Sequence, residues 1–170
     1  IGAHTGTYAI SLAPYVKTVY AFEPQKCTYY ALCGGVALSG LTNVECLRCG
    51  LGNEAQKGDM TLNIVSDDGG GSTVHMPANE SVLRKEVIQI KMLDQFKFDE
   101  RIDFIKMDVE ENELQVLQGA VDTLDEHGWP KILFESNREN PELFGFLEYE
   151  LGYSIVKLHG VSNMFLATKN

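Results

Sequence analysis

The sequence lacks a hydrophobic run approaching the roughly 18 residues that cross a bilayer, and its first residues show no signal-peptide pattern. Basic residues are also scarce: 14 Lys and Arg stand against 24 Asp and Glu, and the net charge is -10 at pH 7. Proteins that bind nucleic acid draw most of their affinity from Lys and Arg contacts to phosphate. These absences predict a cytoplasmic protein without a membrane span, whose partners do not include nucleic acid.

Cysteine is sparse as well, with four in the chain. Cys46 and Cys49 have the spacing of a zinc half-site or a redox pair, but they fall in a predicted strand, where residues three apart point to opposite faces. Cys27 and Cys33 are likewise expected on different faces of a helix. We therefore predict reduced, structural cysteines, in agreement with a reducing compartment.

Strands and helices alternate along the chain. Strands are predicted at 18–22, 44–51, 102–107 and 131–134, and helices at 7–15, 27–39, 112–126 and 141–151. A chain of 170 residues fits one domain, residues 1–170, around a single core. The alternation predicts an α/β fold with a doubly wound, Rossmann-like, mostly parallel sheet. Ile1-Gly2 has the character of a strand end, so we expect a truncated first strand and a natural protein that extends further N-terminally.

Two regions depart from simple alternation. Segments 59–65 and 86–92 alternate polar and apolar residues, which predicts half-buried strands. The glycine-rich stretch 67–73 between them is either a lid or a plain turn. Near the C-terminus, strands at 153–158 and 164–169 are joined too closely for a crossover and are predicted antiparallel. A closing antiparallel hairpin favours the methyltransferase-type variant of the doubly wound sheet.

Ligands of such sheets bind beyond the carboxyl ends of the strands. Gly2 and Gly6 flank a turn into a helix, where the main chain can approach a ligand closely. Their G-x-x-x-G spacing does not match the dinucleotide fingerprint G-x-G-x-x-G, because His4 and Thr7 occupy its later glycine positions. Glu23 ends the strand that follows, near the ~20-residue offset at which a carboxylate binds a ribose diol. Its other interpretation is an exposed residue before a proline turn.

Several phrases together resemble FkbM-type methyltransferases: IGAHTG at 1–6, AFEP at 21–24, LD at 93–94, KMDVE at 106–110 and LQG at 117–119. The resemblance implies an S-adenosylmethionine cofactor and O-methylation of a small sugar-like or otherwise hydroxylated acceptor. From these phrases we predict a cofactor site formed by Gly2, His4, Gly6, Glu23, Pro24 and Asp108. The chain departs from the family at Glu111, where a glycine is usual, and a charged side chain there would reshape the acceptor pocket.

Removal of a hydroxyl proton calls for a base near the donor crevice. Asp108, Glu110, Glu113 and Glu135 are the candidates at the right edge of the sheet, and of these we predict Asp108, Glu110 and Glu135 as the catalytic residues. Asp108 could instead face the methionine amine or sulfonium, and Glu113 has a structural alternative at a helix start. His75 is expected to be exposed near the glycine-rich loop.

Other functions stay open at this level. No metal is predicted, although Asp108, Glu135 and Asn137 offer oxygen ligands that suit Mg²⁺ or Ca²⁺. A nicotinamide-dependent oxidoreductase is the rival enzyme class, since it uses a related sheet. A non-catalytic binding domain that has kept the fold is the third hypothesis, and the sequence does not specify the acceptor or the oligomeric state.

Overall fold

The computed structural model describes residues 1–76, 81–136, 140–160 and 163–169. Its strands are β1 (Val19–Phe22), β2 (Val44–Leu47), β3 (Gly50–Leu51), β4 (Gly58–Ile64), β5 (Arg84–Lys91), β6 (Phe104–Met107), β7 (Lys131–Glu135), β8 (Ser154–Lys157) and β9 (Met164–Thr168). Its helices are α1 (Thr7–Leu12), α2 (Lys26–Leu38), α3 (Glu113–Gln118), α4 (Val121–Glu126) and α5 (Pro141–Gly145). Short helical turns are η1 (Ala13–Tyr15), η2 (Glu54–Gln56), η3 (Leu93–Gln95) and η4 (Phe146–Glu150).

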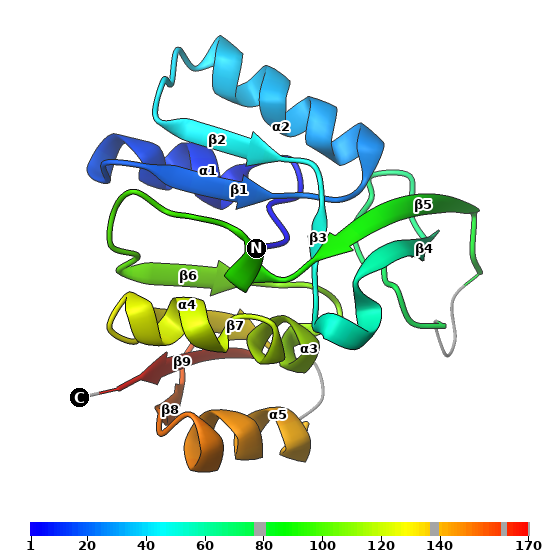
Figure 1. The fold of residues 1–170 in the computed structure, drawn as a ribbon. Coiled ribbons are helices and arrows are strands. Elements are labelled where there is room, and N and C mark those ends of the chain that lie inside the picture. The colour runs from blue at the N-terminus through cyan, green and yellow to red at the C-terminus, as the bar shows by residue number, and fades with distance from the viewer. Residues whose placement is uncertain (77–80, 137–139, 161–162, 170) are drawn as a thin grey trace.

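The strands form three hydrogen-bonded groups (Figure 1). β1 and β2 are a parallel pair, and β6, β7, β9 and β8 follow one another in a sheet that is parallel at β6–β7 and antiparallel from β7 to β8. β5 lies between β3, its parallel neighbour, and β4, its antiparallel one. The predicted α/β class and the closing antiparallel hairpin are confirmed, but the sheet is not mostly parallel: of the strand pairings among the described residues, three are parallel and three are antiparallel.

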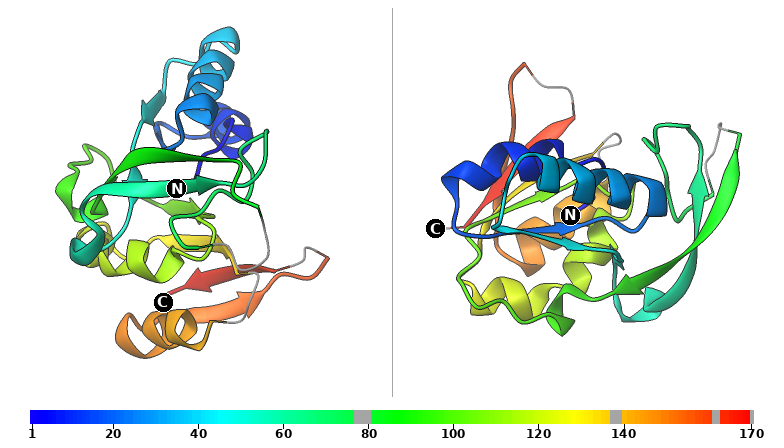
Figure 2. Two further views of the ribbon diagram at one scale, coloured as in Figure 1. Left: turned by 90° about the vertical axis from the view of Figure 1, so that its right-hand side faces the viewer. Right: turned by 90° about the horizontal axis from the view of Figure 1, so that it is seen from above.

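Helices cover both faces of the strands, and two neighbouring residues of β1 show this. Ala21 packs with Ala9 of α1 and Leu32 of α2, whereas the next residue, Phe22, belongs to the larger core cluster formed with α3 and α4. Figure 2, seen from above, places α1 and α2 on one side of the strands and α3 and α4 on the other. The larger cluster also takes in α5 and η4, and it contains Phe134 and Leu147, both fully buried.

A single continuous sheet is not observed, because β1 and β6 do not pair directly. Among the described residues, only the first three link these two strands, at their carboxyl ends. Ile1 N donates to Lys106 O (2.8 Å), and Gly2 N and Ala3 N both donate to Phe22 O (3.1 and 2.9 Å). Asp108 N in turn donates to Ile1 O at 3.2 Å. The glycine loop is thereby held between the ends of β1 and β6, where the predicted site lies.

Two predicted elements are broken by tertiary contacts. The strand expected at 44–51 divides into β2 and β3, which pair with different neighbours. The helix expected at 112–126 divides into α3 and α4, because Gly119 at the junction packs against the main chain of Gly52. Asp94 then supplies the missing cap of α4, accepting from Thr123 N at 2.8 Å and Thr123 Oγ1 at 2.7 Å. The LD and LQG phrases thus meet at this junction.

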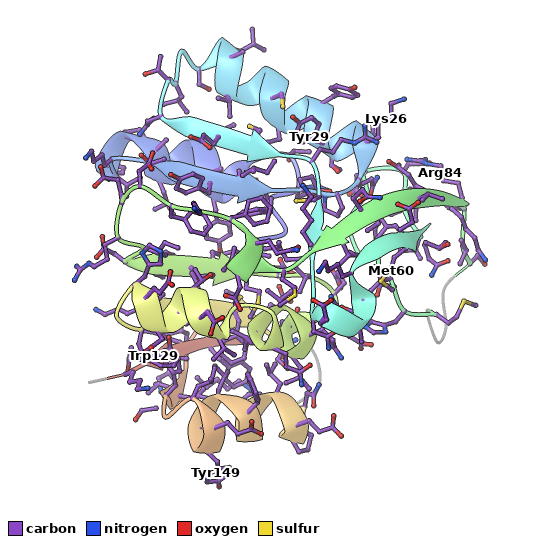
Figure 3. All side chains as sticks on the ribbon, viewed as in Figure 1. Lys26, Tyr29, Met60, Arg84, Trp129 and Tyr149 are labelled. Carbon is purple, nitrogen blue, oxygen red and sulfur yellow. The ribbon has the colours of Figure 1, made fainter. Side chains whose placement is uncertain are left out.

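The β4–β5 hairpin projects from one side of the molecule (Figure 1). Figure 3 shows Met60 and Arg84 on this hairpin and Tyr149 pointing outward from η4. Within the described residues, no helix has the length and apolar character that a bilayer crossing requires. The four cysteines are free thiols, and Cys46 and Cys49 pack into different core clusters, as predicted.

Candidate functional site

A cavity of about 770 Å³, the main cavity, runs along the gap between β1 and β6 and reaches the carboxyl ends of β1, β3 and β6. Most of the predicted site residues line it: Gly2, His4, Glu23, Pro24, Asp108 and Glu110. Segments far apart in the sequence are therefore brought together at the edge where a doubly wound sheet binds its ligands. Gly6 does not line this cavity. It caps α1 in a left-handed conformation (φ 98°) against Leu32.

Glu23 is the best-anchored polar group of the main cavity, and it is buried, with 7% of its surface exposed. One carboxylate oxygen accepts from Gln25 N (2.9 Å) and Thr28 Oγ1 (2.8 Å). The other oxygen accepts from His4 N at 2.8 Å. A carboxylate has about four acceptor positions, so three donors hold it rigidly and leave capacity for a ligand hydroxyl. The interpretation of Glu23 as an exposed residue before a turn is wrong.

The glycine-rich loop between β4 and β5 closes one side of the main cavity. His4 Nε2 lies 2.9 Å from Asp68 O, so the glycine loop and this second loop are hydrogen-bonded to each other. Gly69 packs so closely on the first turn of α2 that a Cβ there would lie 2.6 Å from Thr28 Cγ2. Residues 69–72 line the cavity, which favours a lid over a plain turn.

Behind this loop, the wall of the main cavity is apolar. Leu62, Ile88 and Ile90 come from the paired strands β4 and β5, and each is at most 4% exposed. Leu51 at the end of β3 and Pro24 after β1 extend the same wall. An apolar wall facing a few fixed polar groups is the usual composition of a small-molecule site.

Asp108 follows β6 and carries the cavity's main ion pair. Lys106 Nζ lies 2.8 Å from Asp108 Oδ2, and the Lys106 side chain is 13% exposed. The ammonium also lies 4.8 Å from the centre of the Tyr8 ring. Lys106 thus neutralises Asp108 locally and fixes the direction of its carboxylate.

A second cavity of about 350 Å³, the acidic cavity, shares Asp108 and Glu110 with the main cavity. Glu135 lines this one, together with Glu111, Glu113, His75 and Ser136. Burial raises the pKa of Glu135, and the charge of Asp108 raises it further. Burial likewise raises the pKa of Glu113 to about 7. The two cavities meet at the phrase that follows β6.

Comparison with known proteins can be set against this geometry. Residues 1–155 match the model of a family described as the methyltransferase FkbM domain. The chain belongs to this family. A solved structure described as a SAM dependent methyltransferase from Aquifex aeolicus is similar to the chain at 16% identity. That similarity covers 98% of this chain and 76% of the other, with a TM-score of 0.48. No curated protein matches the chain.

Sequence reasoning missed several residues of this FkbM domain's site. Thr28 lies in the first turn of α2, where its hydroxyl donates to Glu23, and Lys106 on β6 donates to Asp108, which follows the strand. The polar–apolar alternation of β4 and β5 predicted a buried face but not that this face forms the cavity wall. His75 was expected to be exposed, but it is partly buried, and its Nε2 has no hydrogen-bond partner among the described residues.

A metal site finds no support in the described part of the FkbM domain, where His, Cys, Asp and Glu side chains do not gather in threes around a common point. Asn137, one of the oxygen ligands considered above, lies outside the described residues. The other two, Asp108 and Glu135, both line the acidic cavity, and Asp108 is engaged by Lys106.

The turn after Asp108 explains why glycine is usual at position 111. Glu110 and Glu111 both have positive φ, 51° and 74°, a region that costs an L-residue roughly 1–2 kcal/mol. Glu111→Gly is therefore expected to raise the free energy of unfolding by about 0.5–1 kcal/mol, after the greater chain entropy of glycine is subtracted. Urea denaturation measures this change.

Glu126→Gly, at the exposed end of α4, is the matched control and is expected to destabilise by about 1 kcal/mol. A loss of stability in Glu111→Gly would mean that the contacts of the Glu111 side chain outweigh the backbone strain.

Proposed function

We propose that this FkbM domain binds S-adenosylmethionine in the main cavity and transfers its methyl group to a hydroxyl of a small acceptor in the acidic cavity. The observation that carries this proposal is the junction of the two cavities at Asp108 and Glu110. Donor and acceptor in neighbouring cavities with a shared wall have the proximity that a displacement reaction requires. The smaller volume of the acidic cavity favours a small, sugar-like or otherwise hydroxylated acceptor.

The residues of the main cavity fit this cofactor. The remaining acceptor position of the Glu23 carboxylate suits one hydroxyl of a ribose diol, because a fixed carboxylate gives a charge-assisted hydrogen bond to a hydroxyl. The apolar wall of Leu62, Ile88 and Ile90 suits an adenine ring, and Asp108 suits the amino group of the methionine tail. When bound, S-adenosylmethionine supplies an electrophilic methyl group on a sulfonium.

The chain's own contribution is then largely positional. The glycine loop is tied to β1 and β6 through main-chain hydrogen bonds, and Glu23 ties it to α2. The loop at 69–72 restricts solvent on one side of the cavity. A cofactor held against these fixed groups loses little further freedom before reaction, which is the source of a proximity effect.

The rival nicotinamide function has less support. The second glycine of a dinucleotide fingerprint lets the main chain approach a pyrophosphate. His4 stands at that position, and its side chain crosses to Asp68 O instead of leaving the loop open. The carboxylates of Glu110 and Glu111 near the junction would also repel a pyrophosphate.

Calorimetric titration of S-adenosylhomocysteine into the protein tests the donor site, with NAD as the comparison ligand. The expected result is saturable binding of S-adenosylhomocysteine and at least about tenfold weaker binding of NAD, a difference of about 1.4 kcal/mol. Binding of NAD alone would support the oxidoreductase. Binding of neither ligand would leave the non-catalytic domain as the better interpretation.

A further inference from the structure

Several carboxylate residues line the acidic cavity. They come from the turn after β6, from the first residue of α3 and from the end of β7: Asp108, Glu110, Glu111, Glu113 and Glu135. Within the described part of the chain, two other charged or titratable side chains approach this group, His75 from the β4–β5 loop and Lys106 from β6. Lys106 forms an ion pair with Asp108. The carboxylates that line the acidic cavity therefore have different surroundings.

Glu113 differs from the others in its burial. It is 6% exposed and nevertheless lines the acidic cavity. One of its oxygens accepts from Val109 N at 3.1 Å, so the turn between β6 and α3 orients the carboxylate. A buried carboxylate with a fixed orientation beside a substrate-sized cavity has the geometry of a general base.

Resting on the proposed methyl transfer, we propose that Glu113 is the catalytic base that accepts the acceptor's hydroxyl proton. The acceptor oxygen forms a bond to the methyl carbon of S-adenosylmethionine. The carbon–sulfur bond breaks, and its electron pair goes to sulfur, which becomes the neutral thioether of S-adenosylhomocysteine. The hydroxyl proton passes to the Glu113 carboxylate, so charge and atoms balance without a further reactant.

The protonation properties of Glu113 suit this role. Burial raises its pKa to about 7, and the charges of Asp108 and Glu110 act in the same direction against the hydrogen bond from Val109 N. A base with a pKa near the working pH combines sufficient basicity with a large deprotonated fraction. Asp108 suits the role less well, because it accepts from Lys106 at 2.8 Å.

Carbon-13 NMR of glutamate-labelled protein tests this assignment without a known acceptor. The Glu113 carboxyl signal is identified by its loss in Glu113→Gln, whose amide oxygen can still accept from Val109 N. Its pKa is then measured in the free protein, with S-adenosylhomocysteine and with S-adenosylmethionine. The two ligands differ by the methyl group and the positive charge on sulfur, so their comparison reports how near Glu113 lies to the reacting atoms.

If Glu113 is the base, its pKa is expected to be lower with S-adenosylmethionine than with S-adenosylhomocysteine by about one pKa unit or more, because a positive charge within roughly 10 Å has this effect at an effective dielectric constant of about 20. Glu150, at the exposed end of η4 and outside the lining of both cavities, is the matched control, and its signal is expected to be the same in both complexes. Its signal is assigned from Glu150→Gln.

The outcomes separate the two proposals. If both ligands bind but the pKa of Glu113 is the same in both complexes, Glu113 orients the turn and is not the base, while the proposed function stands. If the pKa of Glu135 is lowered by the charged ligand and that of Glu113 is not, Glu135 takes the role. If neither ligand changes any signal and calorimetry detects no binding, the proposed function itself fails.

Discussion

Replacing Glu23 with alanine is expected to weaken S-adenosylhomocysteine binding by roughly 10- to 100-fold, from the loss of one charge-assisted hydrogen bond to a ribose hydroxyl. The same change is expected to lower the free energy of unfolding by about 3 kcal/mol, because buried donors lose their acceptor. Those donors are Gln25 N and Thr28 Oγ1, with His4 N at the edge of the cavity. Calorimetry measures the first effect and urea denaturation the second.

Thr28→Val separates these two consequences of the Glu23 change. It removes one hydrogen bond to the carboxylate and leaves the carboxylate itself in place. We expect a loss of about 1–2 kcal/mol in stability but less than about fivefold in affinity. Glu45→Ala, at an exposed position on β2, is expected to change neither quantity. If Thr28→Val weakens binding as much as Glu23→Ala does, Glu23 acts through the fold and not through the ribose.

Local patterns predicted most of the elements because each pattern depends on neighbours in sequence. The alternation at 59–65 and 86–92 became β4 and β5, and the apolar run before Glu23 became β1. The position of Glu23 and Asp108 followed from the same reasoning, since residues after parallel strands share one edge of the sheet. These predictions did not require knowing which helices and strands pack against one another.

Several features that sequence reasoning missed concern how far a side chain is buried, which depends on how the segments of the chain pack together. Glu113 is 6% exposed, whereas helical periodicity alone places a first-turn glutamate at the surface. Lys106 pairs with Asp108 only two residues away, but the sequence alone does not show that this ion pair lines the main cavity. The backbone strain at Glu111 arises in the turn by which the chain passes from the end of β6 to the start of α3.

The division of the predicted 112–126 helix is the clearest case, because its cause is a single close approach. A Cβ on Gly119 would lie 2.1 Å from Gly52 O, 3.0 Å from Gly52 C and 3.3 Å from Asn53 Cα. All three are main-chain atoms, which cannot move aside as a flexible side chain would. The Gly119 carbonyl also accepts from Asp94 N at 3.1 Å, so the junction is held on two sides.

Gly119→Ala is therefore expected to lower the free energy of unfolding by about 3 kcal/mol, at the upper end of the usual cost of overpacking. Gly145→Ala is its matched control in α5, where the nearest atom to the new Cβ lies 3.9 Å away. That change is expected to stabilise by about 0.5–1 kcal/mol, the usual preference of a helix for alanine. Urea denaturation of both variants and the wild type measures the difference.

The Gly119 change should also reach the site, because α3 runs from Glu113 to the residue before Gly119. Pushing the junction away from Gly52 would shift α3, the helix that places Glu113 at the wall of the acidic cavity. The pKa of Glu113 is then expected to fall from about 7 toward that of an exposed glutamate, since burial is the main cause of its elevation. An unchanged pKa in a destabilised Gly119→Ala protein would mean that the turn at Val109 alone positions the carboxylate.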